Sequence, residues 1–456
     1  MQTYSRTESV WQRMSDTEKQ ACYDYCENYK KFLDQARTER LANREIIRQA
    51  KAAGFRSLEE YSSLQAGDKV YLDHKGKAVI LAVIGRDELT SGLKVVGSHI
   101  DSPRLDLKAN PLDEKDGLVF LRTHYYGGIK KYQWVCMPLA LVGVVVTREG
   151  KVVDVEIGLS DKDPVLYITD LLPHLGHRQA EKKVAEAITG EMLLPVIGGH
   201  ADGKDSARET ILQLLKEKYG IEDEDFASAE LEVIPAQGAR DVGLDRAFIL
   251  GHGHDDRVCS YGNLAAILNA EPGQYTQVAL FADKEEIGSY GNTGVTSTYF
   301  TDFVSDLLAL RGIESHLALR QVFRHTEILS ADVTAAFDPT FPDTMARNNS
   351  ALTGHGIVLT KYTGARGKSG SNDANAEFVG KVRRIFNEAD VPWQIGELGK
   401  VDEGGGGTIA LYLAAWGCEV IDCGVAMLSM HAPLELVEKT DAYSAYLAYK
   451  AFFESK

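Results

Sequence analysis

Apolar and polar residues follow two different periods along this chain. From Phe248 onward, short apolar runs such as 277–282 are followed by segments of helical periodicity, including 299–310 and 375–387. Apolar runs that alternate with amphipathic helices are typical of the βαβ units of a parallel sheet. The C-terminal half is therefore predicted to be an α/β domain.

The N-terminal hundred residues show similar elements. Ser15 and Glu18 have the spacing of a capping box that opens a helix, and Gly54 is a predicted helix stop. Apolar runs at 78–84 and 93–96 then predict two strands. We assign these elements to the same α/β domain.

Residues 118–157 interrupt this pattern. Their apolar runs contain no segment of helical length, and Glu149-Gly150 is typical of a hairpin turn. A helix at about 209–219 and a strand at 231–235 follow a polar stretch. This region is therefore predicted to be rich in β structure.

The pattern as a whole predicts two domains, of which one is discontinuous. Residues 1–105 plus 245–456 form the α/β domain, and residues 106–244 form a β-rich insertion. The fold class is α/β. The predicted functional residues lie on both sides of the insertion, so the chain would assemble its site across a gap in sequence.

Composition narrows the possible partners. The formal net charge of −16 argues against a nucleic-acid-binding surface and against docking on anionic lipid. We find no apolar stretch near the roughly 20 residues that span a bilayer and no signal-peptide pattern, so no membrane association is expected. The six cysteines do not form a disulfide framework, and Cys22 and Cys26 lack a neighbouring pair for a metal site. A reduced, cytoplasmic protein is expected.

Two pairs of polar residues carry the first indication of chemistry. His99 and Asp101 follow an apolar strand, and a carboxylate beside a metal-binding imidazole fixes its tautomer and raises its basicity. Glu285 and Glu286 follow a second apolar run and offer one carboxylate as a ligand and one as a general base. Together they predict metal-assisted hydrolysis of an acyl bond.

Five polar segments share a position directly after an apolar run. They are His99–Asp101, Gly253–Arg257, Glu285–Glu286, Ser330–Asp332 and Met430–Pro433. Loops at the carboxyl edge of an α/β sheet meet, and a two-metal site there needs cations about 3.5–4 Å apart. Imidazole and carboxylate ligands suit Zn²⁺, with Co²⁺ or Mn²⁺ as alternatives.

Each segment also has a structural explanation when it is taken alone. A histidine after a strand is usually structural, and an Asp-Asp-Arg sequence commonly caps a helix. Adjacent glutamates usually mark a solvated face. The hypothesis of a site depends on the recurrence of all five segments at the same structural position.

The motifs in these segments occur in a characteristic order. They are Ser98-His99-Ile-Asp101-Ser-Pro, Asp255-Asp256-Arg257, Asp283-x-Glu285-Glu286-Ile-Gly-Ser, Ser330-Ala-Asp332 and Met427-Leu-Ser-Met-His431-Ala-Pro-Leu-Glu. In this order they resemble the aspartyl aminopeptidase / aminopeptidase I family of dinuclear zinc aminopeptidases. The resemblance covers nearly the whole chain, including the insertion.

The resemblance implies a role for each residue. Glu285 acts as the general base and then as the proton donor to the leaving amine, and Asp101 orients His99. Asp256 pairs with Arg257, although the two adjacent aspartates could exchange roles. The five implied metal ligands are Asp255 as the bridge, His99 and Asp332 at one cation, and Glu286 and His431 at the other.

The resemblance also implies an architecture. The expected fold is a phosphorylase/hydrolase-like mixed sheet flanked by helices, and the β-rich insertion serves dimerisation and oligomerisation. Family members form closed tetrahedral homododecamers whose internal active sites receive peptides with a free N-terminus. Two divalent cations per subunit, most readily zinc, are implied.

One segment departs from the family pattern. Members usually carry His-Pro-Asn-Tyr after the Ser-x-Asp ligand, whereas this chain has Phe337-Asp338-Pro339-Thr340. A negative charge on Asp338 in the substrate pocket would disfavour acidic N-terminal residues. We therefore expect neutral or basic N-terminal residues to be accepted as well as Asp or Glu, or better.

The glycine run 404–407 is a second candidate element for substrate binding. Backbone N–H groups of residues such as Gly405 and Gly406, before a predicted helix, can hold a carboxylate or an oxyanion. The alternative is a flexible turn. Lys368 and His355 lie near the predicted pocket in sequence, without a motif that assigns them a role.

Two rival hypotheses remain. His252 and His254 form a His-x-His pair, which opens the site of metal-dependent amidohydrolases with a (β/α)₈ barrel. The second rival is a shell-forming homologue without activity, and its signature would be a missing base or ligand. Glu285 and all five expected ligands are present in this sequence.

Overall fold

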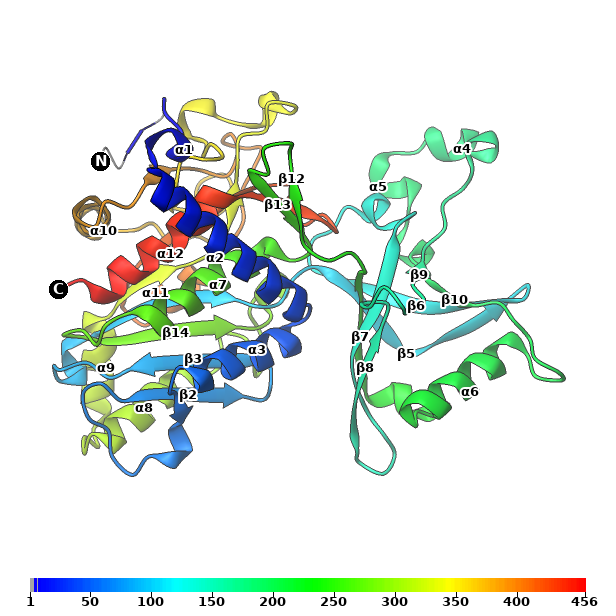
Figure 1. The fold of residues 1–456 in the computed structure, drawn as a ribbon, viewed down its shortest axis with the longest axis horizontal. Coiled ribbons are helices and arrows are strands. Elements are labelled where there is room, and N and C mark those ends of the chain that lie inside the picture. Colours follow the sequence, from blue (N-terminus) through cyan, green and yellow to red (C-terminus); the bar gives the residue numbers. More distant parts are fainter. Residues whose placement is uncertain (1–3, 6) are drawn as a thin grey trace. The chain divides into compact units, whose positions relative to one another are not determined.

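The computed structural model describes residues 4–5 and 7–456, which form two compact units. The larger unit consists of Met1–Asp101, Ala239–Met430 and Glu435–Lys456, and the smaller unit consists of Ser102–Gly238 and His431–Leu434. Figure 1 shows that each unit contains both helices and strands. The mixed α/β class predicted from the sequence is confirmed. The smaller unit differs from the predicted insertion 106–244 in two ways: its main segment is Ser102–Gly238, and it includes His431–Leu434 near the C-terminus.

A nine-stranded sheet forms the centre of the larger unit. Its strands, in spatial order, are β1 (Arg56–Ser57), β2 (Lys69–His74), β3 (Ala78–Val83), β14 (Thr276–Ala282), β4 (Leu93–His99), β15 (Glu327–Ser330), β19 (Glu419–Gly424), β17 (Ile357–Thr360) and β18 (Trp393–Ile395). The four strands β14, β4, β15 and β19 are parallel. Parallel strands buried on both faces explain the continuous apolar runs in the sequence.

Helices cover both faces of this sheet. The helices of this unit are α1 (Val10–Arg13), α2 (Asp16–Gln35), α3 (Glu39–Ala52), α7 (His254–Asn269), α8 (Tyr299–Leu310), α9 (His316–His325), α10 (Ala376–Glu388), α11 (Ala410–Ala414) and α12 (Lys439–Glu454). Successive side chains of a strand point to opposite faces. In β3, Val79 and Leu81 accordingly join the core under α2, α7 and α12, whereas Ile80 joins the core under α8, α9 and α11.

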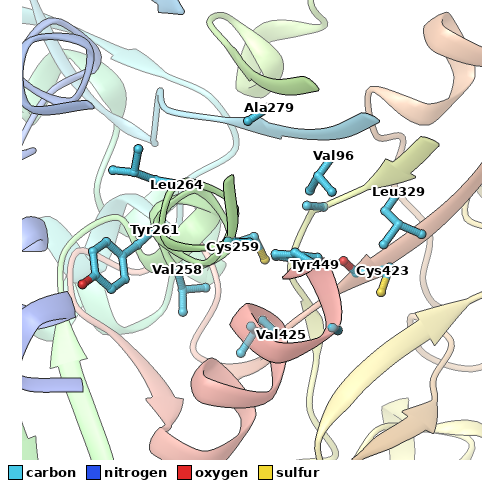
Figure 2. Close-up of a cluster of buried hydrophobic side chains, with 14 of the residues drawn as sticks. Val96, Val258, Cys259, Tyr261, Leu264, Ala279, Leu329, Cys423, Val425 and Tyr449 are labelled. Atoms are coloured by element: carbon cyan, nitrogen blue, oxygen red, sulfur yellow. Dashed lines mark hydrogen bonds between the residues drawn. The ribbon is translucent and has the colours of Figure 1, made fainter. Parts of the chain in front are cut away.

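Figure 2 shows part of the first of these cores, where side chains of α7 and α12 meet the parallel strands. Cys259 of α7 and Tyr449 of α12 lie beside Leu329 and Cys423 of the sheet, and all four are fully buried. The Tyr449 hydroxyl donates a hydrogen bond to the carbonyl of Cys423 at 2.8 Å, which satisfies its polar end. This packing fixes the strands whose carboxyl ends carry the predicted ligands.

Local sequence signals account for several element ends. Ser15 and Glu18 form the predicted capping box, with the Ser15 hydroxyl accepting from the Glu18 N–H at 3.3 Å. Helix α3 ends at Ala52, just before Gly54, whose φ of 89° lies in the left-handed region that favours glycine. Helix α8 spans the predicted residues 299–310.

A second sheet of the larger unit connects several loops of the predicted site. Its five strands, in spatial order, are β12 (Arg240–Val242), β13 (Phe248–Gly251), β21 (Glu435–Glu438), β20 (Ala426–Leu428) and β16 (Thr334–Ala335). Strand β13 leads into the Asp255 segment, and β16 follows the Asp332 segment. This sheet therefore anchors the Asp255 and Asp332 loops in addition to the large sheet.

The smaller unit contains a seven-stranded sheet. Its elements are β11 (Ala229–Pro235), β5 (Arg104–Lys115), β6 (Leu118–Tyr126), β10 (Val196–Gly198), β9 (Leu166–Tyr167), β7 (Pro138–Val146) and β8 (Val152–Ile157), with the helices α4 (His177–Ala180), α5 (Val184–Ala187) and α6 (Ala207–Tyr219). Strand β11 pairs with both β5 and β7, so the sheet closes on itself. Strands β7 and β8 form a hairpin around the predicted turn at Glu149-Gly150. The dimerisation role of this unit stays a prediction.

Candidate metal centre

Three neighbouring parallel strands deliver predicted ligands to the same edge of the large sheet. Strand β4 ends at His99 and lies between β14 and β15. Its register places Ala282 opposite His99 and Ser330 opposite Gly97. The adjacent glutamates are the third and fourth residues after β14, and Asp332 is the second residue after β15. Carboxyl ends of parallel strands are the usual place for a site in such sheets.

The imidazole of His99 is the centre of this cluster. It is 1 % exposed, and its Nε2 lies 3.2 Å from Asp255 Oδ1, 3.7 Å from Asp332 Oδ1 and 4.0 Å from Glu285 Oε2. Two groups offer ligand atoms within 4.8 Å of one another: His99 with Glu285 and Asp332, and His99 with Asp255 and Glu286. The structure therefore brings four predicted functional carboxylates together around the imidazole of His99.

Asp101 contacts three parts of the cluster. Nδ1 of His99 lies 3.3 Å from Oδ1 of Asp101 and 3.1 Å from its backbone carbonyl oxygen, and the orienting role of the carboxylate stays a prediction. Oδ1 also accepts a hydrogen bond from the backbone N–H of Glu285 at 3.1 Å, and Oδ2 accepts one from Glu286 at 3.2 Å. Asp101 is 0 % exposed. The contacts to the two backbone N–H groups have no signature in the sequence and were not predicted.

A turn after β14 also fixes the two glutamates. Lys284 has a φ of 66°, and its Nζ donates to Asp283 Oδ2 at 2.9 Å. The Thr293 hydroxyl donates to the same carboxylate oxygen at 2.5 Å. Asp283 is 2 % exposed, so these bonds anchor the turn in the interior. The sequence alone gave no role to Lys284 or Thr293.

The two adjacent aspartates face different partners. Oδ1 of Asp255 points to the ring of His99, whereas Oδ2 of Asp256 accepts from the backbone N–H of His99 at 3.3 Å. The Asp255 N–H is held by buried Glu435 at 3.1 Å. This geometry favours Asp255 over Asp256 as a ligand. Arg257 donates to the carbonyls of Ile100 and His252, both at 3.4 Å, and its predicted pairing with Asp256 stays a prediction.

A glycine supports the position of Asp332. A Cβ added to Gly424 of β19 would lie 1.8 Å from the carbonyl oxygen of Asp332. Real Cβ atoms do not approach an oxygen this closely, so any side chain would push the Asp332 backbone away. Gly424 was not singled out from the sequence, because nothing local indicates this contact.

The charges of the cluster favour a divalent cation. Burial, together with the charge of the neighbouring Asp332 carboxylate, raises the pKa of Glu285 to about 8. Burial likewise raises the pKa of Asp332. For His99, burial lowers the pKa, but hydrogen bonds to Asp101 and other carboxylates outweigh it and hold the pKa well above 6.5. Several buried carboxylates around one imidazole are therefore stabilised only by protons or by a cation.

The His-x-His hypothesis is wrong for this fold. Nδ1 of His254 lies 2.6 Å from the Tyr29 hydroxyl, and Nε2 lies 3.1 Å from the Ile249 carbonyl, so both ring nitrogens have protein partners. Burial lowers the pKa of His254 to about 3. The mixed sheet also differs from a (β/α)₈ barrel, in which eight parallel strands close. His254 is a structural histidine of the core.

His431 belongs to the smaller unit. Its Nδ1 lies 2.7 Å from the carbonyl oxygen of Gly128. An Nδ1–H that donates to this carbonyl fixes the tautomer in which Nε2 carries the lone pair, as in metal-binding histidines. Its role as a ligand stays a prediction.

The candidate substrate residues occupy loops. Oδ1 of Asp338 accepts from the Thr340 N–H at 2.8 Å within its own turn, and Asp338 is partly exposed. Gly405 and Gly406 are exposed. Helix α11, which follows them, has five residues, too few for the substantial dipole that the sequence-based hypothesis assumed. Substrate binding by this segment would therefore depend on the backbone N–H groups of the glycine run and not on a helix dipole.

The remaining residues named from the sequence have local partners. Lys368 Nζ pairs with Asp373 at 2.8 Å, and Nδ1 of His355 lies 2.9 Å from the Thr353 carbonyl. Cys22 and Cys26 are buried in the core. Among the described residues, no helix has the length and apolar character that a membrane span requires.

A buried imidazole and convergent carboxylates at the carboxyl edge of an α/β sheet define a metal-dependent hydrolase. The family model for the aminopeptidase I zinc metalloproteases (M18) matches residues 32–453, and the chain belongs to this family. A probable M18 family aminopeptidase 1 of Clostridium acetobutylicum is 46% identical over 455 residues, which cover 98% of each chain. The family resemblance inferred from the motifs is confirmed.

Solved structures agree with this assignment. An M18 aminopeptidase of Thermotoga maritima is 41% identical and has a TM-score of 0.95, covering 99% of this chain and all of its own. The mApe1 dodecamer of S. cerevisiae is 20% identical and has a TM-score of 0.76, covering 94% and 95% of the two chains, and shows a shared fold. The protein is thus an M18-type aminopeptidase of the zinc metalloprotease class.

Proposed function

We propose that this protein removes N-terminal residues from peptides at a site with two zinc ions. The observation that carries the proposal is the convergence of His99, Asp255, Glu285, Glu286 and Asp332 within one buried cluster. Its nitrogen and oxygen donors are those that zinc accepts, and the excess of carboxylates matches the charge of divalent cations. Co²⁺ and Mn²⁺ suit the same donors.

Each donor has a proposed place. Asp255 would bridge the two ions, His99 and Asp332 would complete one site, and Glu286 and His431 would complete the other. The position of Asp255 Oδ1 beside the His99 ring supports the first of these assignments. When bound, the zinc ions polarise the scissile carbonyl and lower the pKa of water.

Glu285 supplies the proton transfers. Its side chain is 15% exposed, and its backbone is held by Asp101, so the carboxylate has a defined position beside the cluster. It accepts a proton from the attacking water and later donates this proton to the leaving amine. The presence of this base argues against the alternative of a non-catalytic shell-forming homologue. Asp101 acts as a positioning residue.

We further propose a homododecameric assembly in which the smaller unit makes subunit contacts. The assembly named for the S. cerevisiae relative supports this proposal through the shared fold. Size measurement by light scattering would test it, and a monomer at micromolar concentration would contradict it.

A hydrolysis panel with the zinc-loaded protein tests the activity. We expect cleavage of dipeptides with a free α-amine and no cleavage of the same dipeptides after N-acetylation. Equal cleavage of both sets would indicate a general amidase instead.

The same assay with Leu-, Lys- and Asp-anilides tests the predicted effect of Asp338. Because its carboxylate would repel an acidic N-terminal residue, Leu and Lys substrates should be cleaved at least as fast as Asp. A strong preference for Asp would contradict this role of Asp338 and leave the aminopeptidase assignment intact.

A further inference from the structure

The glycine run 404–407 presents backbone donors that the described part of the chain does not use. Gly405, Gly406 and Gly407 are exposed, and within residues 4–5 and 7–456 their N–H groups donate no hydrogen bond. The carbonyl of Gly406 accepts from the Gly364 N–H at 2.6 Å, which orients one face of the run. The unused N–H groups are suited to the carbonyl oxygens of a peptide.

The lack of side chains is required at the centre of the run. A Cβ on Gly405 would lie 2.4 Å from the carbonyl oxygen of Gly364, and Gly405 has a φ of 144°. The run therefore lies closely against the neighbouring loop that contains Gly364. This contact restricts its position from one side.

A hydrogen bond to a buried carboxylate restricts the run at its C-terminal end. The Thr408 hydroxyl donates to Oδ1 of Asp422 at 2.6 Å, and Asp422 is 3% exposed. The next residue, Ile409, is 1% exposed, and its Cδ1 would lie 3.2 Å from a Cβ on Gly97. Two successive residues after the run are thus attached to the large sheet.

The points of attachment lie beside the candidate ligands. Ser330 of β15 is opposite both Gly97 of β4 and Asp422 of β19, so these three residues form one row across the sheet. His99 and Asp332 each lie two residues beyond this row, toward the carboxyl edge. The run is therefore attached to the same strands that position the metal ligands.

We propose that Asp422, acting through Thr408, is a positioning residue that sets the distance between the N–H groups of Gly405–Gly407 and the metal centre. A bound peptide would place a backbone carbonyl oxygen on these N–H groups while its N-terminal peptide bond lies at the cluster. The proposal rests on the proposed aminopeptidase function. It adds that substrate binding by the run depends on the buried carboxylate of Asp422.

Thr408→Val tests the proposal because it removes the hydroxyl at nearly constant volume. We expect KM for a tripeptide with a free α-amine to rise about tenfold with kcat little changed, since the run would bind ground state and transition state alike. Zinc content measured by mass spectrometry should stay at the wild-type value. Hydrogen exchange over residues 362–370 should become faster, because Gly364 donates to the displaced run.

Two further variants complete the experiment. Thr408→Ser keeps the hydroxyl and should restore the wild-type KM. Thr301→Val is the matched control, because it removes a hydroxyl that donates to Thr298 at 2.7 Å on α8. It should change neither KM nor exchange over residues 362–370.

Three outcomes would overturn the proposal. An unchanged KM in Thr408→Val with faster exchange would mean that the hydrogen bond only stabilises the fold. An equally raised KM in Thr408→Ser would show that the hydroxyl is irrelevant. If the wild type in the same assay did not cleave the free-amine peptide, the proposed function itself would fail, and this inference would fail with it.

Discussion

The most informative perturbation of the metal centre is Asp101→Asn, which changes the charge and one acceptor atom but not the shape. Asp101 holds three groups at once: Nδ1 of His99 and the N–H groups of Glu285 and Glu286. A carboxamide has a single acceptor oxygen, so its NH₂ group would face one of these donors. The variant therefore separates positioning from direct participation.

The expected magnitudes follow from these contacts. Leaving a buried N–H without an acceptor costs about 1–3 kcal/mol of the free energy of unfolding. Loss of the carboxylate behind a metal-binding imidazole typically lowers metal affinity by about 10–100-fold. Glu285 would also move from its position, and a general base contributes about 10²–10⁴-fold. We therefore expect kcat/KM to fall by roughly 10²–10³-fold even at saturating zinc.

The measurements need a control of the same chemistry. Asp441 is also 0% exposed and accepts from the backbone N–H groups of Gly354 and Gly356, both at 2.7 Å. Asp441→Asn should leave zinc affinity and kcat/KM within about twofold of wild type, since these bonds go to Gly354 and Gly356 and not to a candidate ligand, and sites that share no partner act independently. Unfolding is measured without zinc, because a bound ion adds its own stabilisation.

The reasoning would be refuted by either of two results. Wild-type zinc affinity and kcat/KM in Asp101→Asn would show that its contacts do not position the centre. Equal losses in Asp441→Asn would show that any buried carboxylate has the same effect through general destabilisation.

Three further predictions concern the same centre. Glu285→Gln should lower kcat by about 10²–10⁴-fold with unchanged zinc content, and wild-type turnover would remove Glu285 from the mechanism. Gly424→Ala should weaken zinc binding at least about tenfold in a chelator competition, because its Cβ displaces a ligand. Gly380→Ala, whose Cβ meets open space, should bind zinc normally. Zinc affinity should fall as pH falls, since the pKa of the proposed ligand His99 is held well above 6.5 and that of Asp332 is raised by burial, so protons on these two groups compete with the ion. Calorimetry in buffers of different ionisation enthalpy measures this proton release, and a pH-independent affinity would contradict it.

The α/β class, several of the candidate site residues and the family could be predicted from the sequence alone. Strands such as β3 and β4 are fully buried in an α/β sheet, and their continuous apolar runs show this directly. Metal chemistry also restricts which residue types can act, so His99 and the adjacent Glu285 and Glu286 stand out at the ends of such runs. Their order along the chain was sufficient to indicate the family.

Only the tertiary structure decided which of these residues meet and what holds them. Asp101 binds backbone N–H groups, and a backbone donor has no residue type that a sequence could reveal. Gly424 matters because a strand distant in sequence passes against Asp332. The hypothesis that His254 is a ligand is wrong because Tyr29 and Ile249 contact its two ring nitrogens. Contacts of this kind depend on packing between segments far apart in the chain, so the local sequence does not predict them.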